Sequence, residues 1–360
     1  MKRFKISLLM VMVLVFAISM TTADCQLLKN VIKTKGGGGS DVVKLISYIP
    51  EDAQLLISIN WENLAKTDLL DLAKAQLGED FQIIEAMGVD IKSDIQHAIL
   101  GITFDEEPIA YGIVAGKFNE AKIMKTFKDQ GAEVESKKIG GKKAYALEGL
   151  YFIFAPEGVL FTASEGEGTE QAFEKMLTVG EKNLANNQKM VKLVTDTDTS
   201  ATAWGVFVIP DKLKEEMKSD SEEIPFDVDA VQSIGSSLNY AEKILFKGAI
   251  HFSKKGEADK LDKFLTEQLG KLNPEENPNM PEEVLDLIKG IGHKVDGNAL
   301  RVNVSATLDQ LKPIIREITG IPMDEEGEDE GEEWGDDEGE EEKDEDNGEE
   351  EEEEDDDWGE

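Results

Sequence analysis

Residues 134–163, VESKKIGGKKAYALEGLYFIFAPEGVLFTA, decide the fold class of this chain. A Gly-Gly pair at 140–141 separates two short strand patterns, and Pro-Glu-Gly at 156–158 separates two more. Glycine pairs of this kind form the tight turns of β-hairpins, because glycine adopts positive φ without steric cost. Two successive hairpins predict an antiparallel sheet.

Helical patterns flank these hairpins on both sides. Residues 120–129 place Ile123 and Phe127 on one helical face, and a longer helical stretch is expected from Thr169 to about Val194. Antiparallel hairpins with long intervening helices are typical of the α+β class. We therefore expect α+β modules in which helices cover one face of an antiparallel sheet.

The sequence also shows an internal similarity. Residues 55–64 (LLISINWENL) align with 204–213 (WGVFVIPDKL) at an offset of 149, and each combines an apolar strand with a helix start. Residues 112–127 parallel residues 246–264 in the same way. Either residues 41–323 contain an internal duplication, or two strand–helix units are similar by chance.

Duplication predicts two related α+β modules, at residues 41–198 and 199–323. In the second module, Asp-Gly-Asn at 296–298 marks another hairpin turn. The same two modules would offer a cleft between them to a solute or a lipid.

The first 23 residues have the three-part pattern of a secretory signal peptide. Three basic residues precede an apolar run at 6–18, and small residues then allow cleavage after Ala23. An apolar run of this length is short for a bilayer span. We expect export to the periplasm or the extracellular space, with an uncleaved membrane anchor as the alternative interpretation.

A short linker follows the signal peptide, at residues 24–40, and ends in the flexible string GGGGS. It contains Cys25, the single cysteine of the chain, so that no internal disulfide can form. Asp24 precedes this cysteine where a bacterial lipobox has a small residue, which argues against lipidation. Contact with a membrane is expected only if the signal segment is retained or Cys25 is lipidated.

The charge of the chain is concentrated at its C-terminal end. Of a formal net charge of −38, residues 324–360 carry −26, from 27 acidic residues and Lys343. A segment with so few apolar side chains cannot bury enough area to offset the entropy of ordering, so we expect a disordered acidic tail. The overall charge also disfavours binding to nucleic acids.

Two kinds of site are predicted in this tail. Dense carboxylates without a rigid cage should bind divalent cations such as Ca²⁺ loosely and without specificity, with no other cofactor expected. Two tryptophans could anchor a basic protein partner that the acids attract, or could simply be solvated. The predicted metal ligands are Glu326, Glu328, Glu330, Asp336 and Asp337, and the predicted partner anchors are Trp334 and Trp358.

Three short motifs resemble exported bacterial cell-envelope proteins of unknown function. They are YIPEDA at 48–53, GVDIKSDI at 88–95, and GKF at 116–118. In that family a P-x-D-A strand start is followed by a G-[IV]-D-x-x-x-D-[IV] segment and a G-x-F strand end. The resemblance implies a cell-envelope setting and a repeated α+β module, and it brings no catalytic residues.

Catalytic patterns are weak in this sequence. The three histidines, His97, His251 and His293, have no second ligand at the helical spacing of zinc proteases. Asp90 and Asp94 stand four residues apart and form a possible carboxylate pair for a hydrolase, although such a pair in a loop is usually structural. We therefore expect a non-enzymatic protein with a scaffold or binding role.

Overall fold

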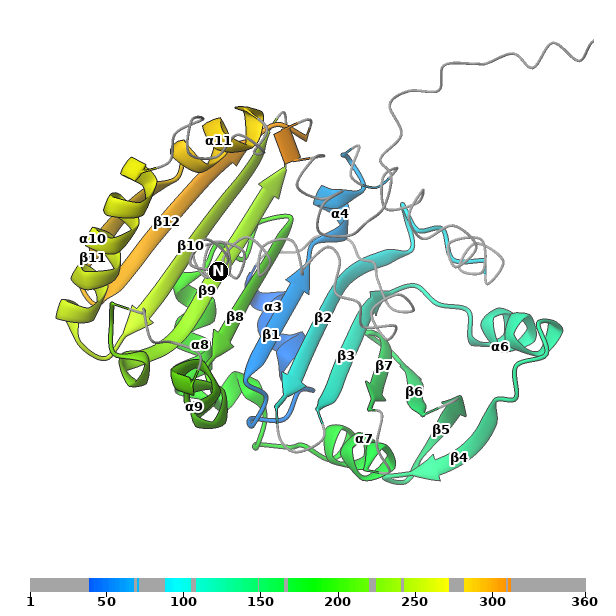
Figure 1. Cartoon of the computed structure of the whole chain (residues 1–360). Coiled ribbons are helices and arrows are strands. Elements are labelled where there is room, and N and C mark those ends of the chain that lie inside the picture. Colours follow the sequence, from blue (N-terminus) through cyan, green and yellow to red (C-terminus); the bar gives the residue numbers. More distant parts are fainter. Residues whose placement is uncertain are drawn as a thin grey trace, which may run out of the picture. The chain divides into compact units, whose positions relative to one another are not determined.

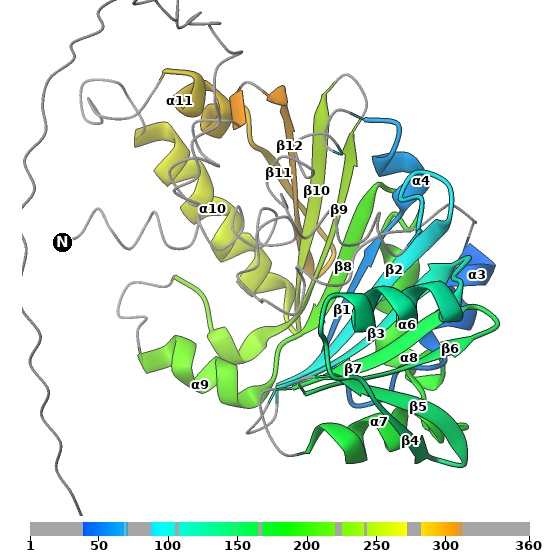
Figure 2. The ribbon, with the colours of Figure 1, turned by 90° about the vertical axis from the view of Figure 1, so that its right-hand side faces the viewer.

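A computed structural model describes the following residues: 39–67, 70, 88–104, 108–147, 149–164, 168–219, 225–240, 243–271, 282–308, 310 and 311. Its strands form one antiparallel sheet with the order β11-β12-β10-β9-β8-β1-β2-β3-β7-β6-β5-β4 (Figure 1). Helices pack on this sheet, so the predicted α+β class is confirmed. The strands turn progressively from one edge of the sheet to the other (Figure 2), as the right-handed twist of β-strands requires.

The strands of the sheet are short to medium in length. They are β1 (Leu55–Ile59), β2 (Ile95–Thr103), β3 (Ile109–Gly116), β4 (Glu135–Ile139), β5 (Lys142–Leu147), β6 (Leu150–Ala155), β7 (Gly158–Ala163), β8 (Ala203–Val208), β9 (Val231–Tyr240), β10 (Ile244–Phe252), β11 (Gly292–Asp296) and β12 (Ala299–Ala306). The predicted hairpins at 134–163 and around 296–298 are therefore confirmed.

The helices occupy the connections between these strands. They are α3 (Gly39–Ile46), α4 (Trp61–Leu64), α6 (Glu120–Asp129), α7 (Thr169–Leu177), α8 (Gln188–Asp196), α9 (Asp211–Ser219), α10 (Lys255–Lys271) and α11 (Glu282–Lys289), with short 3₁₀ helices η1 (Leu184–Asn186) and η2 (Val228–Ala230). Helix α3 begins at Gly39 and therefore includes the last two residues of the expected linker. The predicted signal peptide and acidic tail lie outside the described residues.

The hairpin turns show why glycine is required at their positions. Gly140 and Gly141 have φ values of 56° and 79°, the two positive values of a type I′ turn. Gly158 has φ 148°, and a Cβ atom there would collide with the carbonyl oxygen of Val114 on the neighbouring strand β3. The second hairpin therefore packs against β3 only because residue 158 has no side chain.

The long helical stretch predicted for residues 169–194 is wrong, because the chain breaks between α7 and α8. Gly180 has a positive φ of 53°, and Asn183 is extended. The intervening segment instead pairs with the chain before β1: Pro50 forms a β-bridge with Asn183, and the Leu184 amide donates to the Ile49 carbonyl at 2.8 Å. Tertiary pairing thus overrides the helical pattern.

The two predicted modules meet in the middle of the sheet. Strand β1 pairs with β8, and from this pair β2 and β3 extend on one side as β9 and β10 extend on the other. All described residues belong to a single compact unit. The division at residues 198 and 199 and the duplication itself stay predictions.

The faces of the sheet correct the alignment of the two halves by one residue. Leu55 belongs to the hydrophobic cluster on one face, whereas Trp204, its partner at an offset of 149, belongs to the cluster on the other. Successive side chains of a strand alternate between faces, so an odd error in alignment exchanges the faces. An offset of 150 keeps Ile57 and Phe207 on one face and also aligns the first residues of α4 and α9.

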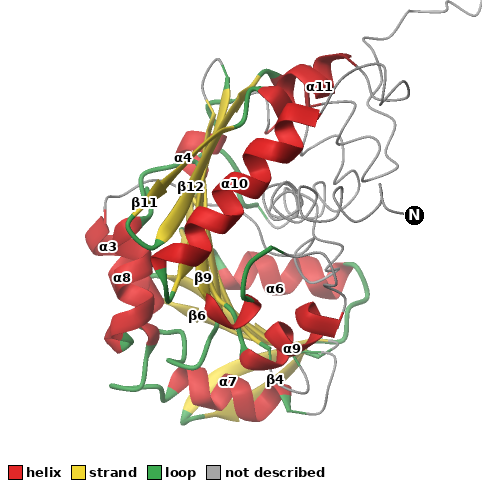
Figure 3. Cartoon of the chain, turned by 60° about the vertical axis from the view of Figure 1, so that its left-hand side comes forward, coloured by secondary structure: helices red, strands yellow, loops and turns green. Residues whose placement is uncertain are grey.

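Helices cover both faces of the sheet, so the expectation of a single covered face is wrong. We call face A the side that carries Leu56, Ile113 and Trp204, which α3, α7 and α8 cover. Face B carries Leu55 and Phe207, and α6, α9, α10 and α11 pack on that side (Figure 3). The central strands are apolar on both sides and therefore need helices on both.

Candidate binding face

The site residues that the sequence predicted cannot be placed on this fold. All lie outside the described residues, as does Cys25. They are Glu326, Glu328, Glu330, Asp336 and Asp337 for cations, and Trp334 and Trp358 for a partner. Among the described residues, no group of three or more His, Cys, Asp and Glu side chains is placed to hold a metal ion.

The three histidines lie on three different strands. His97 is buried on β2, and His251 is half-buried on β10. The Nδ1 atom of His293 on β11 lies 2.8 Å from Oδ1 of Asp262 on α10. The structure thus disperses these side chains and does not gather them into one site.

Asp90 and Asp94 form a turn that precedes β2. Oδ2 of Asp94 accepts a hydrogen bond from the Asp90 amide at 2.9 Å, and Oδ1 of Asp90 accepts one from the Lys92 amide at 2.8 Å. Oδ2 of Asp90 also accepts from the Ser93 hydroxyl at 2.8 Å. These hydrogen bonds are typical of a turn that carboxylates stabilise. Asp90 and Asp94 therefore have a structural role in this turn.

The two faces differ in how completely their apolar side chains are buried. Among the described residues, the face A cluster has 23 buried members and only 7 partly buried ones. The two main clusters of face B have 12 buried with 11 partly buried members, and 10 with 12. Face B is therefore the less completely sealed apolar surface of the sheet.

The half-buried side chains of face B follow its central strands. Strand register places them in rows that run across β10, β9, β8, β1 and β2. They are Ile57, Ile59, Leu100, Ile102, Ile234, Leu238, Phe246 and Ile250. The surface that they form spans the β1–β8 pair, where the two predicted modules join.

One row of face B is different because it contains three small residues. Ser236 on β9 pairs with Gly205 on β8 and with Gly248 on β10. On the far side of Gly205 the row continues to Ile57 on β1. We call Gly205, Ser236 and Gly248 the small-residue row.

Within the described part of the chain, the hydroxyl of Ser236 has no hydrogen-bond partner, although the residue is only 3% exposed. Buried hydroxyl groups are normally hydrogen-bonded, so this one calls for an explanation. The space above the neighbouring Gly248 is occupied by side chains of other residues. A Cβ atom on Gly248 would lie 2.9 Å from Val302 and 3.2 Å from the ring of Phe246. The half-buried Phe246 ring thus lies over Gly248, beside the serine.

Apolar side chains surround Ser236 on its face. On its own strand, its same-face neighbours are Ile234 and Leu238, two residues away in each direction. Ile234 pairs with Phe207 on β8 and with Ile250 on β10. The ring of Phe207 in turn packs against Phe104, with centroids 5.4 Å apart. The hydroxyl group of Ser236 is therefore a polar group within an apolar surface.

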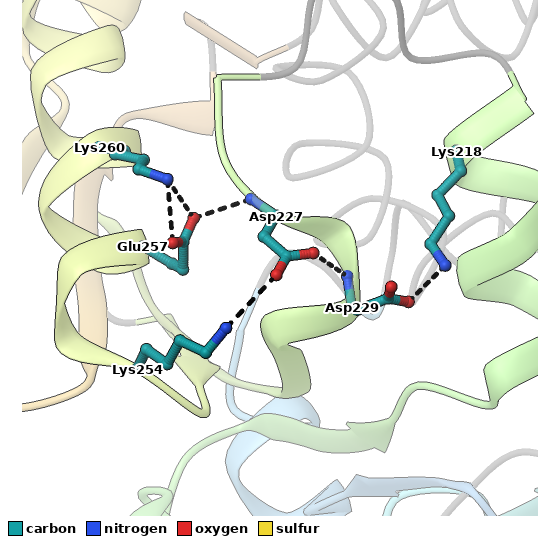
Figure 4. Close-up of polar contacts among 6 residues, drawn as sticks. All are labelled: Lys218, Asp227, Asp229, Lys254, Glu257 and Lys260. Atoms are coloured by element: carbon teal, nitrogen blue, oxygen red, sulfur yellow. Dashed lines mark hydrogen bonds and ion pairs between the residues drawn. The ribbon is translucent and has the colours of Figure 1, made fainter.

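A network of charged side chains fixes the helices that border this surface (Figure 4). Glu257 at the start of α10 accepts the amide of Asp227 at 2.8 Å and binds Lys260 at 3.0 Å. Lys218 of α9 pairs with Asp229 at 2.6 Å. The network thus ties α9, η2 and α10 together along one side of face B.

The same contacts shift the pKa of Glu257. The Asp227 amide, then Lys260, lower the pKa of this carboxyl below its usual value, because both stabilise the charged form. Lys254 adds a further ion pair to Asp227 at 3.6 Å. The bordering lysines Lys218, Lys254 and Lys260 are therefore all paired with acids.

The small-residue row was missed by the sequence reasoning, but a signal was present. Strand β9 reads VQSIGSSLNY, and its serines interrupt an otherwise apolar alternation. Gly205 and Gly248 each interrupt a neighbouring strand. Only the register of β8, β9 and β10 brings these three positions side by side, and register is not readable from single strands.

Comparison with known proteins gives similarities of fold alone. No family model matches this chain, and no curated protein matches it. Three crystal forms of TP0453 are similar in structure: form III (TM-score 0.48, 11% identity, covering 76% of this chain and 97% of that one), form IV (0.44, 11%, 75% and 95%) and form I (0.41, 13%, 76% and 96%). With TM-scores below 0.5, these similarities define neither a family nor a function for this chain.

A search for membrane-spanning helices gives a negative result within the described part of the chain. None of the helices there combines the length and the apolar character that crossing a bilayer requires.

Proposed function

We propose that this chain is an exported, non-enzymatic protein of the cell envelope that binds an apolar ligand, such as a lipid, on face B of its sheet. The pattern of residues 1–23 supports export, and the resemblance of three short motifs supports the envelope setting. The observation that carries the binding role is the contrast between the faces: most apolar side chains of face A are buried, whereas large apolar side chains stay half-buried across face B.

The pairing of β1 with β8 indicates where the ligand would lie. The two predicted modules share a hydrogen-bonded strand pair, so a ligand that contacts both would lie along the sheet. There it would contact Ile57 and Ile102 from one half and Ile234 and Phe246 from the other. Removing such side chains from water is the usual source of affinity for apolar ligands.

Mass spectrometry of the purified full-length protein tests this proposal. Mild extraction should release a co-purified lipid in a stoichiometric amount. As a second measurement, the neutral fluorescent probe N-phenyl-1-naphthylamine should bind saturably, with one site per chain. Absence of lipid together with non-saturable probe fluorescence would contradict the proposal.

A second role belongs to the acidic tail. We infer that residues 324–360 bind divalent cations loosely or attract a basic protein, which their charge of −26 supports. Flexible carboxylates of this kind should bind Ca²⁺ at about 10⁻⁴ to 10⁻³ M. Calorimetric titration with Ca²⁺ of the full chain and of a chain that ends at Met323 tests this role. Equal heats from the two proteins would remove it.

A further inference from the structure

We propose that Ser236 selects the ligand of face B, and that this ligand is a neutral apolar chain with one hydroxyl or ester group that pairs with the serine hydroxyl. This inference rests on the proposed function, and it specifies the ligand class and the residue that recognises it. Two independent observations carry it: the small-residue row, and the unpartnered hydroxyl of a serine that is 3% exposed.

The row provides the place where a ligand can approach the serine. Its neighbours in the row, Gly205 and Gly248, have no side chains, so no side chain of the row stands beside the hydroxyl of Ser236, although the residue is only 3% exposed. The position above Gly248 is taken by the ring of Phe246, which is half-buried. A rotation of this ring would open the row to a chain lying across β9 and β10.

The hydroxyl provides the polar contact. A buried donor without a partner is unfavourable, because the hydrogen bonds that it made to water are not replaced. A ligand oxygen that accepts from Ser236 would remove this cost only in the complex. The serine thus favours a ligand with an oxygen near its chain over a pure hydrocarbon.

The surroundings disfavour a charged ligand. The side chains that flank Ser236 on face B are apolar, namely Ile234, Leu238 and Phe246. The nearby lysines of α9 and α10 are held in ion pairs with Asp227, Asp229 and Glu257. A carboxylate at the row would lose its hydration without gaining a counter-charge, which is strongly unfavourable.

Displacement of N-phenyl-1-naphthylamine from the full-length protein tests this selectivity at pH 8. We would compare 1-dodecanol, sodium dodecanoate and dodecane below their solubility limits. Dodecanol should displace the probe at about one tenth of the dodecanoate concentration or less. It should also bind about three- to tenfold more tightly than dodecane, which is the range of a neutral hydrogen bond.

Two variants assign the effect to the serine. In Ser236→Ala, the advantage of dodecanol over dodecane should disappear while dodecane binding is retained. Ser237→Ala is the matched control, because it removes a hydroxyl from the next residue of the same strand, on face A. The advantage should persist in this control.

The outcomes separate this inference from the function on which it rests. If dodecanoate binds as well as dodecanol, or if Ser236→Ala keeps the preference for the alcohol, the inference is overturned and face B remains an apolar binding surface. If the probe and all three ligands fail to bind the wild-type protein, the inference and the proposed function both fail. Should Ser236→Ala not fold, the comparison of the three ligands on the wild-type protein still decides the ligand class.

Discussion

Face A and face B belong to the same strands, yet they differ in how completely their apolar side chains are buried. Over β1 to β8, face A buries its apolar side chains almost completely under α3, α7 and α8. Over β9 to β12 the same face turns polar, with Lys247, His251, Arg301 and Asn303. The central strands of face B carry mainly apolar side chains, with Ser236 as an exception, and several of these side chains stay half-buried. The two faces thus differ in how completely their apolar side chains are buried, and the proposed binding role rests on this difference.

The largest expected effect is a loss of stability from face A. Trp204 is 0% exposed at the centre of the face A cluster, so Trp204→Ala should lower the free energy of unfolding by about 3–5 kcal/mol. Urea unfolding of the full chain measures this. If the variant still folds, it should retain the probe, because face B is unchanged. A loss below about 1 kcal/mol would contradict the view that face A holds the fold together.

The matched substitution on face B should give the opposite pattern. Phe246 is half-buried over Gly248, so Phe246→Ala should cost only about 1 kcal/mol of stability. It should, however, weaken binding of the neutral probe several-fold, because the ring forms part of the binding surface. A titration with unchanged affinity would show that the probe binds elsewhere.

A smaller effect is expected where the bordering helices are tied together. Glu257→Gln should lower the free energy of unfolding at pH 7 by about 1 kcal/mol, because the charged contacts to the Asp227 amide and to Lys260 are weakened. The folded-state pKa of Glu257 is lowered, so its contribution is full above the ordinary glutamate pKa and is lost as the pH falls through the folded value. Wild type and variant should therefore converge in acid, and a constant difference down to pH 3 would argue against this account.

The smallest effect concerns the polar part of face A. Burial, and then Lys192 and Arg301, lower the pKa of His251, while Asp196 opposes the shift. The neutral form is favoured in the folded state, so stability should fall as the pH drops below the ordinary histidine pKa of about 6.5. His251→Gln should reduce this pH dependence between pH 7 and 5. Unfolding curves that keep the wild-type pH dependence in His251→Gln would contradict the assignment.

Much of the fold follows from local sequence signals. The glycine turn at 140–141 predicted the hairpin of β4 and β5, and the helical pattern at 120–129 predicted α6 at its observed bounds. Such elements are set by turn chemistry and by side-chain periodicity, both of which are local. The same reasoning failed at Gly180 and Asn183, where pairing with Pro50, far away in the sequence, decides the structure.

The candidate site could not be predicted in the same way. The sequence directed attention to the acidic tail, which lies outside the described residues, and to a cleft between modules. The structure instead joins the modules through β1 and β8, and it aligns Gly205, Ser236 and Gly248 in one row. Neither the pairing partner nor the register of a strand is encoded in that strand alone, so the row appears only in the assembled sheet.

The central claim, that an apolar ligand binds on face B, is tested most directly by a crystal structure of the protein with 12-bromo-1-dodecanol. The account predicts an anomalous bromine peak over face B of β8 to β10, with the alcohol oxygen within hydrogen-bond distance of Ser236 Oγ. A bromine peak on face A, or a fully occupied ligand away from face B, would contradict it, whereas a ligand on face B remote from the small-residue row would overturn only the role of Ser236.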